Sequence, residues 1–199
     1  MTTGNPPPYL DVTGVILAGG RSSRMGRDKA TLLVDGVRIF DRTRALLREF
    51  FPQVLIAGDR PDLADAQTPC FPDLYPGSAL GGLYTGLYHA QTPYILAAAC
   101  DIPYPDRQLL RPLLDHYQEQ DVVVFRTREG LEPLFAIYGK RCLAPMRGML
   151  ENGNYRIYDF FPEVRTCYLD PEQFAAATWR RSLTNVNTPD EYGSLPEKK

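Results

Sequence analysis

The residues best suited to chemistry lie between Val15 and Lys29, where an apolar run gives way to a loop with three glycines, three arginines and one lysine. Glycine lets the backbone approach a ligand closely, and backbone N–H groups in a concave loop bind anions. Arginine and lysine side chains neutralise phosphates. The stretch predicts a nucleoside triphosphate site at the C-terminal end of a buried strand.

Two common phosphate-binding motifs do not describe this loop. A Walker A motif needs a lysine directly after its second glycine, but two residues separate Gly26 from Lys29. The dinucleotide fingerprint needs one residue between its first two glycines, and Gly19 and Gly20 are adjacent. The plainer alternative is a glycine-rich turn with solvated basic side chains.

A second candidate is Asp101, which closes an apolar run and stands two residues before Pro103. Magnesium binds one or two carboxylates and completes its octahedron with phosphate and water oxygens. A carboxylate at a strand end could therefore hold Mg²⁺ against substrate phosphates. The structural alternative is a turn or helix-capping aspartate; the neighbouring glycine loop favours metal binding.

Two further segments could contact a polar ligand. Residues 77–83 open a predicted helix with Gly81 and Gly82, and free N–H groups at a helix start attract anions; close packing on the sheet would explain the same glycines. Near the C-terminus, Asn185 and Asn187 face the same side of an extended segment. The alternative is a helix start, for which the Thr188–Pro189 pair is typical. A helix start explains these two residues but gives no reason for either asparagine.

The elements that must position these residues alternate along the chain. We expect strands at 13–18, 54–57, 94–100, 122–126, 133–138 and 164–169, an extended segment at 184–186, helices at 39–50, 80–91, 106–119, 140–151 and 171–177, and a Pro/Gly-rich loop at 69–77. This alternation predicts an α/β fold with three layers and a mostly parallel central sheet. Ligands bind such sheets at the carboxyl ends of the strands, where the glycine loop and Asp101 both lie.

Composition excludes several classes of protein. The chain has 199 residues and a net charge of −2, which suits one domain with no global attraction to nucleic acid or membrane. We expect a flexible leader over 1–11, a single domain over 12–193 and a polar tail over 194–199. The four cysteines lack metal-ligand spacing, and neither a signal peptide nor a membrane-spanning segment is evident, so we expect a cytoplasmic protein.

The glycine loop closely resembles Leu-Ala-Gly-Gly-x-Ser-x-Arg-Met-Gly-x-Asp-Lys, the signature of the guanylyltransferases that mature molybdenum cofactor. The Cys100–Pro103 segment, the Pro133–Ala136 strand and the Asn185–Pro189 segment resemble further motifs of that family, in the same order, so that the resemblance spans about residues 13–192. Ser78–Ala79 departs from the family's Gly-Pro-Leu-x-Gly, which keeps the amide donors but puts the loop shape in question.

The resemblance implies a three-layer, Rossmann-like nucleotidyltransferase that joins the GMP part of GTP to the phosphate of molybdenum-molybdopterin and releases pyrophosphate. It implies Mg²⁺ as cofactor, and other cofactor-biosynthesis proteins and recipient enzymes as further candidate partners.

The residue roles also follow from the resemblance. The expected nucleotide-binding residues are Leu17, Ala18, Gly19, Gly20, Arg21, Lys29, Asp73 and Asp101, with the backbone of the first three at the guanine edge. The expected catalytic residues are Lys29, Arg24 and Asp101, and Asp101 is the expected metal ligand. The expected residues on the acceptor side are Gly81, Gly82, Pro133, Asn185 and Asn187.

Three alternatives stay open. A cytidylyltransferase acting on the same cofactor typically reads Leu-Ala-Ala-Gly, so Gly19 favours guanine. A nucleotidyltransferase acting on a sugar phosphate is more distant. A non-catalytic nucleotide-binding module would fit the departure at Ser78–Ala79, but Lys29 and Asp101 argue against it.

Overall fold

The computed structural model describes residues 9–19, 29–175, 179–183 and 189–193; the side chains of Lys29, Ala175, Pro189 and Asp190 are also outside the description. The strands are β1 (Val12–Leu17), β2 (Leu33–Val34), β3 (Val37–Arg38), β4 (Val54–Ala57), β5 (Cys70–Phe71), β6 (Tyr94–Ala99), β7 (Val122–Arg126), β8 (Leu131–Gly139) and β9 (Thr166–Leu169). The helices are α1 (Ile39–Phe50), α2 (Ala79–His89), α3 (Arg107–His116), α4 (Leu143–Glu151), α5 (Glu172–Ala175), α6 (Trp179–Leu183) and α7 (Pro189–Gly193). Short 3₁₀ turns are η1 (Lys29–Thr31), η2 (Pro61–Leu63), η3 (Lys140–Cys142) and η4 (Ile157–Glu163).

Seven strands form the central sheet in the order β5-β4-β1-β6-β8-β7-β9. Only β8 runs antiparallel to its neighbours; the other contacts join parallel strands. The carboxyl ends of β5, β4, β1, β6, β7 and β9 therefore meet at one edge, which is also where β8 begins. Loops that leave this edge are brought together even when they are distant in sequence.

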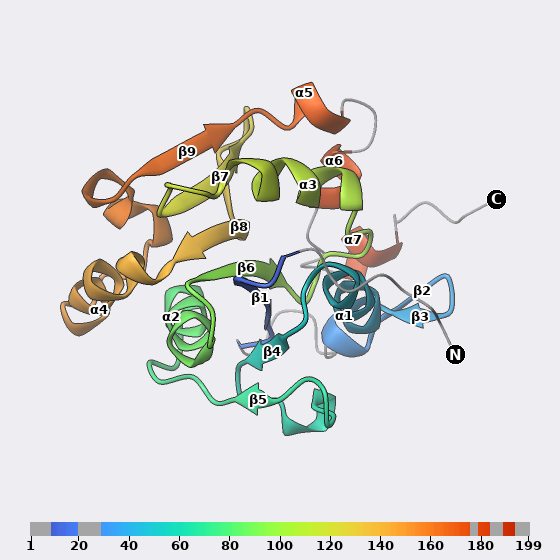
Figure 1. Ribbon diagram of the computed structural model, residues 1–199. Coiled ribbons are helices and arrows are strands. Elements are labelled where there is room, and N and C mark those ends of the chain that lie inside the picture. The colour runs from blue at the N-terminus through green and yellow to red at the C-terminus, as the bar shows by residue number, and fades with distance from the viewer. Residues whose placement is uncertain (1–8, 20–28, 176–178, 184–188, 194–199) are drawn as a thin grey trace.

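Helices cover both faces of the sheet (Figure 1), so the predicted three-layer α/β fold is confirmed. One hydrophobic cluster joins α1, α3 and α6 to one face, and a second joins α2, α4 and η4 to the other. All six residues of β1 are buried, as expected for a central strand apolar on both sides. The sheet thus fixes the position of the loop that follows β1.

Small residues let α2 lie close to the sheet. A Cβ at Gly86 would overlap the Val15 side chain, so only glycine permits this distance between the helix and β1. The loop before α2 is fixed by Thr85, whose hydroxyl accepts from the Leu74 N–H at 2.9 Å and donates to the Gly81 carbonyl at 2.8 Å. The loop and the helix start are therefore held as one unit.

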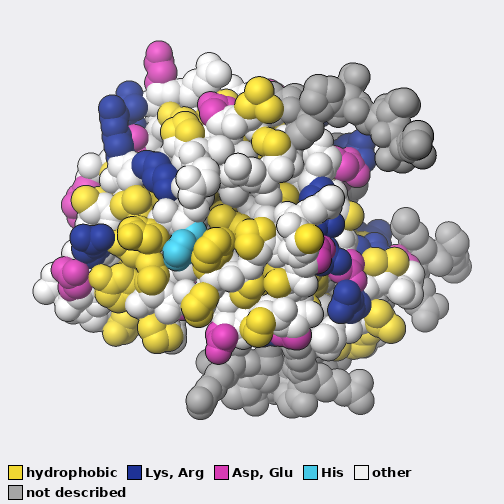
Figure 2. Space-filling model, turned by 60° about the horizontal axis from the view of Figure 1, so that its bottom comes forward, with side chains coloured by type: hydrophobic (Ala, Val, Ile, Leu, Met, Phe, Trp, Pro, Cys, Tyr) yellow, Lys and Arg dark blue, Asp and Glu magenta, His cyan; other side chains and the backbone are white. Residues whose placement is uncertain are grey.

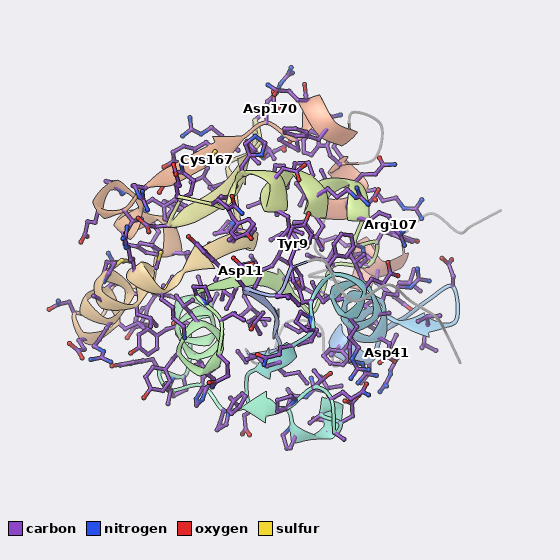
Figure 3. All side chains as sticks on the ribbon, viewed as in Figure 1. Tyr9, Asp11, Asp41, Arg107, Cys167 and Asp170 are labelled. Atoms are coloured by element: carbon purple, nitrogen blue, oxygen red, sulfur yellow. The ribbon has the colours of Figure 1, made fainter. Side chains whose placement is uncertain are left out.

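The predicted leader ends earlier than residue 11. The Tyr9 ring packs on Phe51 and Tyr117 with centroids 6.4 Å away in each case, and the Tyr117 hydroxyl donates to the Asp11 carboxylate at 2.9 Å. Figure 3 labels Tyr9 and Asp11 beside the sheet. Aromatic contact and the buried hydroxyl hold this segment, which composition alone did not indicate.

Most elements match the expectations, with differences in some bounds and two additional elements. The bounds of α1, β4 and β7 are as predicted, while α3 is shorter than 106–119 and the helix expected at 140–151 starts with the 3₁₀ turn η3. The loop at 69–77 contains the short strand β5, and the β2–β3 hairpin was not expected. The segment 184–186 lies outside the described residues.

Hydrophobic side chains gather on the face shown in Figure 2, where α2, α4 and β5 lie. His89 ends α2 and stacks on Phe71 of β5 with ring centroids 4.1 Å apart, so the histidine packs the helix end against this edge strand. In the described part of the chain, every helix is too short or too polar to cross a lipid bilayer.

Candidate active site

The end of β1 is held between its two neighbouring strands. The Ala18 N–H donates to the Ala57 carbonyl at 2.9 Å, and the Cys100 N–H donates to the Leu17 carbonyl at 3.1 Å. Backbone pairing thus continues beyond the end of β1 on both sides. It places the start of the glycine loop beside Cys100, the residue that precedes Asp101. The structure brings together the regions of Leu17–Gly19 and Asp101, as the parallel sheet predicted.

Asp73 lies directly against Gly19. A Cβ on Gly19 would stand 2.6 Å from Oδ2 of Asp73, and a Cβ on Gly82 would stand 3.5 Å from its Oδ1. The Asp73 carboxylate therefore sits between the glycine loop and the first turn of α2. Two residues assigned to the nucleotide, far apart in sequence, meet here because β5 and β1 flank β4.

The Asp73 carboxyl is desolvated. Its Oδ1 is buried and has no hydrogen-bond partner among the described residues. Burial, with a smaller effect from the Asp59 carboxylate, raises the pKa of Asp73 above its ordinary value. A buried oxygen with no partner costs free energy, and a perturbed carboxyl in a cavity is typical of functional sites. Such an oxygen could accept a ligand N–H.

A cavity of about 680 Å³ opens beside this carboxylate. Its walls come from the loops after β1, β4 and β5 and from the turn before α2: Ala18, Gly19, Asp59, Arg60, Pro72, Asp73, Pro76 and Gly77. The volume lies in the range of about 300–1,000 Å³ usual for small-molecule sites. The cavity occupies the β5-β4-β1 half of the sheet edge.

Gly58 also shapes this cavity, and sequence analysis missed it. Its φ is +138°, and a Cβ there would stand 2.6 Å from the Gly19 nitrogen. Its own N–H donates to the Phe71 carbonyl at 2.9 Å. Glycine is needed because the chain after β4 runs against the glycine loop in a conformation that side chains rarely adopt. A glycine directly after a predicted strand was the available signal.

The two glycines at the start of α2 were expected on the acceptor side, but they lie beside the loop of Asp73 and Tyr75, on the β5-β4-β1 half of the edge. A Cβ on Gly81 would overlap the Tyr75 carbonyl, so that glycine allows the 73–77 loop to pack on the helix. Ser78 caps the helix by accepting from the Gly81 N–H at 3.0 Å. The departure at Ser78–Ala79 thus provides a standard helix start and leaves Gly82 beside Asp73.

The loop after β6 links Asp101 to the C-terminal helices. The Arg181 guanidinium lies 3.5 Å from the centroid of the Tyr104 ring, and the Arg42 guanidinium lies 5.8 Å from the same ring. Further on, the Tyr192 hydroxyl donates to the Leu33 carbonyl, shortly after η1. The chain is therefore anchored on both sides of Asn185 and Asn187, near the loops that bear Lys29 and Asp101.

Glu132 is a second perturbed carboxyl at this edge. It is half-buried near the start of β8, and no hydrogen bond from any described residue reaches it. Burial, and the nearby Glu129 carboxylate, raise the pKa of Glu132 to about 7. The Tyr138 hydroxyl donates to the Pro133 carbonyl at 2.7 Å and so holds this end of the strand. Pro133, expected on the acceptor side, thus lies between Asp101 and β7.

Some of the predicted site residues belong to segments outside the described part of the chain. Gly20, Arg21, Arg24, Asn185 and Asn187 lie outside the described residues, as does the side chain of Lys29, whose backbone begins η1. Within the described ranges, no three His, Cys, Asp or Glu side chains form a cluster that could hold a metal ion.

The chain is similar to proteins of one family. Residues 14–165 match the model of the MobA-like NTP transferase domain. The probable molybdenum cofactor guanylyltransferase of Pelotomaculum thermopropionicum is 36% identical over 185 residues, which cover 92% of this chain and 90% of that protein. The protein of the same description from Carboxydothermus hydrogenoformans is 32% identical over 187 residues, covering 93% and 95%.

Solved structures share the fold. Molybdopterin-guanine dinucleotide biosynthesis protein A from Archaeoglobus fulgidus superposes with a TM-score of 0.76 at 19% identity, covering 91% of this chain and 95% of that one. A protein of Aquifex aeolicus described as putative gives a TM-score of 0.74 at 28% identity, covering 90% and 95%. The first likeness shows the fold alone, because the identity is low.

Proposed function

Because this chain belongs to the MobA-like NTP transferase family, we propose that it transfers GMP from GTP to the phosphate of molybdenum-molybdopterin. The observation that carries the proposal is the contact between Gly19 and Asp73 beside the cavity. Sequence analysis assigned both residues to the nucleotide, and the fold brings them to one pocket.

Guanine suits this pocket better than cytosine. Guanine presents adjacent N1–H and N2–H donors, and Asp73 offers a buried oxygen that accepts no hydrogen bond from the described residues. Backbone carbonyls at Leu17–Gly19 are the other candidate acceptors. A site whose acceptors would be left unpaired by the wrong base discriminates strongly, which supports GTP as the donor.

The transfer needs positioning more than a general base. An oxygen of the acceptor phosphate, already anionic near neutral pH, attacks the α-phosphorus of GTP; the new P–O bond forms as the bond to the β-phosphate bridging oxygen breaks. Pyrophosphate carries away the electron pair. The main obstacle is to bring two polyanions together, and Arg21, Arg24 and Lys29 would hold the triphosphate and offset its charge.

The donor set at the edge fits a magnesium ion. Asp101, two residues after the end of β6, provides one carboxylate, which is the protein contribution that Mg²⁺ commonly uses beside substrate phosphates. When bound, the ion would neutralise developing negative charge on the phosphates. Asn185 and Asn187 would contact the acceptor phosphate or shape its side of the site.

A comparison of donors tests the proposal. The purified chain, Mg²⁺ and molybdenum-molybdopterin are incubated with GTP, CTP or ATP, and pyrophosphate and the dinucleotide product are measured. We expect rapid product formation with GTP and much slower reaction with the other two. A preference for CTP would favour the cytidylyltransferase, and tight GTP binding without pyrophosphate release would favour the binding module.

A further inference from the structure

A small hydrophobic cluster lies apart from the two large clusters on the faces of the sheet. Its buried members are Leu32, Val34 and Ile39, and the partly buried rings of Tyr104 and Tyr192 pack on it. The cluster lies where the β2–β3 hairpin meets the start of α1, and α7 lies beside it (Figure 1).

The small cluster joins segments that carry predicted site residues. Leu32 directly follows η1, the turn that begins at Lys29. Tyr104 stands three residues after Asp101 in the loop that follows β6. Tyr192 belongs to α7, the helix after the segment expected on the acceptor side. Segments that are distant in sequence therefore rest on the same buried side chains.

Two arginines hold the Tyr104 ring on this cluster. The Arg181 guanidinium of α6 lies 3.5 Å from the ring centroid, and the Arg42 guanidinium of α1 lies 5.8 Å from it. Arg42 also donates to the Val34 carbonyl and pairs with Asp35 at 3.1 Å. The ring is thereby connected to α1, to α6 and to the β2–β3 hairpin.

Tyr104 is the second anchor of the loop that bears Asp101. The first anchor is Ile102, which is buried in the large cluster beneath the sheet. A loop fixed at Ile102 alone could still rotate about that residue. Pro103 and Pro105 restrict the backbone on both sides of Tyr104, so fixing the ring also fixes the direction in which the loop leaves β6.

The position of this loop matters for the proposed chemistry. Mg²⁺ needs nearly octahedral geometry and takes most of its oxygens from phosphates and water when the protein offers one carboxylate. In the proposed site Asp101 is that carboxylate, and the turn of Lys29 carries the side chain expected on the triphosphate. Binding is tighter when the spacing of two such segments is fixed before the ligand arrives.

Resting on the proposed function, we propose that Tyr104 is a positioning residue for Asp101. Its ring holds the Asp101 loop in a fixed place relative to the Lys29 turn, so that Mg²⁺ and the triphosphate bind together. Tyr104 acts through Asp101 and needs no contact with either ligand.

GTP binding measured by calorimetry across a Mg²⁺ titration, without acceptor, tests this role. Tyr104→Ala should raise the Mg²⁺ concentration that gives half of the maximal enhancement of GTP affinity by about tenfold, since the freedom regained by the backbone of one residue is worth about that factor. GTP affinity in EDTA should stay unchanged, and saturating Mg²⁺ should restore the wild-type affinity. Tyr104→Phe keeps the ring and should match the wild type.

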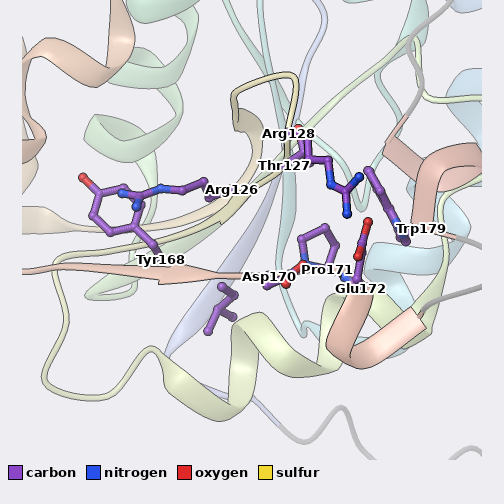
Figure 4. A pocket seen from close by; sticks show the side chains of 9 residues that line it. Arg126, Thr127, Arg128, Tyr168, Asp170, Pro171, Glu172 and Trp179 are labelled. Carbon is purple, nitrogen blue, oxygen red and sulfur yellow. Dashed lines mark hydrogen bonds between the residues drawn. The ribbon is translucent and has the colours of Figure 1, made fainter.

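A purely structural tyrosine would give a different result. Tyr104→Ala would then melt at a lower temperature but keep the wild-type dependence of GTP affinity on Mg²⁺, which would overturn the proposal. The matched control is Tyr168→Ala on β9, the last strand of the sheet, where the Arg126 guanidinium lies 3.9 Å from the Tyr168 ring centroid (Figure 4). This control loses a similar cation–π contact and should leave the Mg²⁺ dependence unchanged.

Arg181→Ala keeps the proposal testable if Tyr104→Ala does not fold. Arg181 is exposed, so its removal should spare the fold, and the loss of its contact with Tyr104 should shift the Mg²⁺ dependence at least twofold in the same direction. If Tyr104→Ala is unfolded, a wild-type Mg²⁺ dependence in Arg181→Ala overturns the proposal.

A separate assay of GMP transfer distinguishes this inference from the proposed function. If transfer to molybdenum-molybdopterin fails but Tyr104→Ala shifts the Mg²⁺ dependence of GTP binding, the positioning role stands and the proposed reaction falls. If transfer proceeds and Tyr104→Ala keeps the wild-type Mg²⁺ dependence, the reaction stands and the positioning role falls. GTP binding by the wild type that does not respond to Mg²⁺ would also contradict the positioning role.

Discussion

The Asp73 carboxylate occupies the space that a side chain at residue 19 would need: a Cβ on Gly19 would stand 2.6 Å from Oδ2 of Asp73. The glycine therefore does more than loosen the loop. It admits a buried hydrogen-bond acceptor to the wall of the cavity that we propose for GTP, and in that proposal base selection depends on the contact between Gly19 and Asp73.

Gly19→Ala should weaken GTP use while leaving the fold intact. Its φ lies outside the left-handed region, so alanine is compatible with the backbone, but the new methyl group must displace Asp73. We expect the KM for GTP to rise by about tenfold, which corresponds to about 1.4 kcal/mol, and the rate ratio of GTP to CTP to fall.

The matched control is Gly148→Ala in α4, where a Cβ would meet nothing within 4 Å. Initial rates with both nucleotides and a thermal melt are measured for each variant. An unchanged GTP/CTP ratio in a Gly19→Ala protein that melts normally would place base selection elsewhere.

Gly58→Ala should be severely destabilising. The substitution combines a φ of +138° with a Cβ that would stand 2.6 Å from the Gly19 nitrogen. Backbone strain costs about 1–3 kcal/mol, and overpacking costs about 1–3 kcal/mol more. Gly36→Ala provides the comparison, since its φ is +75° and its Cβ would meet no atom within 4 Å. In urea denaturation, the free energy of unfolding should be much lower for Gly58→Ala than for Gly36→Ala. Equal losses of unfolding free energy in the two variants would show that crowding at residue 58 is unimportant.

Much of the fold was predictable because its signals are local. The helix at 39–50 has buried apolar residues at helical spacing, and the strands at 54–57 and 122–126 are short apolar runs with breaks beside them. The β2–β3 hairpin also has a local signal, the Asp35–Gly36 dipeptide, which is typical of a two-residue hairpin turn. In the structure these residues have φ of 50° and 75°, the left-handed conformation that such a turn requires.

The rest depends on contacts between distant segments. Strand β5 has only two residues and exists because Cys70 and Phe71 pair with β4. Asp73 lies next to Gly19 because β5 pairs with β4. The motifs therefore identified both residues as candidate site residues but did not predict that they are in contact. Likewise, the insertion of β8 between β6 and β7 desolvates Glu132, and strand order cannot be deduced from local pattern.

Asp101→Asn should abolish Mg²⁺-dependent turnover with a modest loss of GTP affinity. The amide keeps the volume of the side chain but lacks the charge that magnesium binding needs. Turnover is measured across a magnesium titration, and GTP binding is measured by calorimetry. If Asp101→Asn keeps the wild-type turnover rate at low magnesium concentration, Asp101 has only a structural role in the turn.

Glu132 should make stability depend on pH. Its folded-state pKa of about 7 exceeds the ordinary 4.5, so between these values the folded state keeps a proton that the unfolded state has lost. The free energy of unfolding therefore falls as pH rises from about 4.5 to about 7. Glu132→Gln should remove this contribution and gain melting temperature relative to wild type across that window. Glu163→Gln, at an exposed position, is the control and should follow the wild type. If the melting temperatures of wild type and Glu132→Gln depend on pH in the same way, the burial argument is refuted.

The fate of isotopic label tests the central claim most directly. GTP labelled at the α-phosphorus and GTP labelled at the γ-phosphorus are given in parallel to the chain with molybdenum-molybdopterin and Mg²⁺. The account predicts that the α label appears in the cofactor product, that the γ label appears in pyrophosphate, and that the two form in equal amounts. Transfer of the γ label to the acceptor, or release of pyrophosphate at the same rate without acceptor, would contradict GMP transfer.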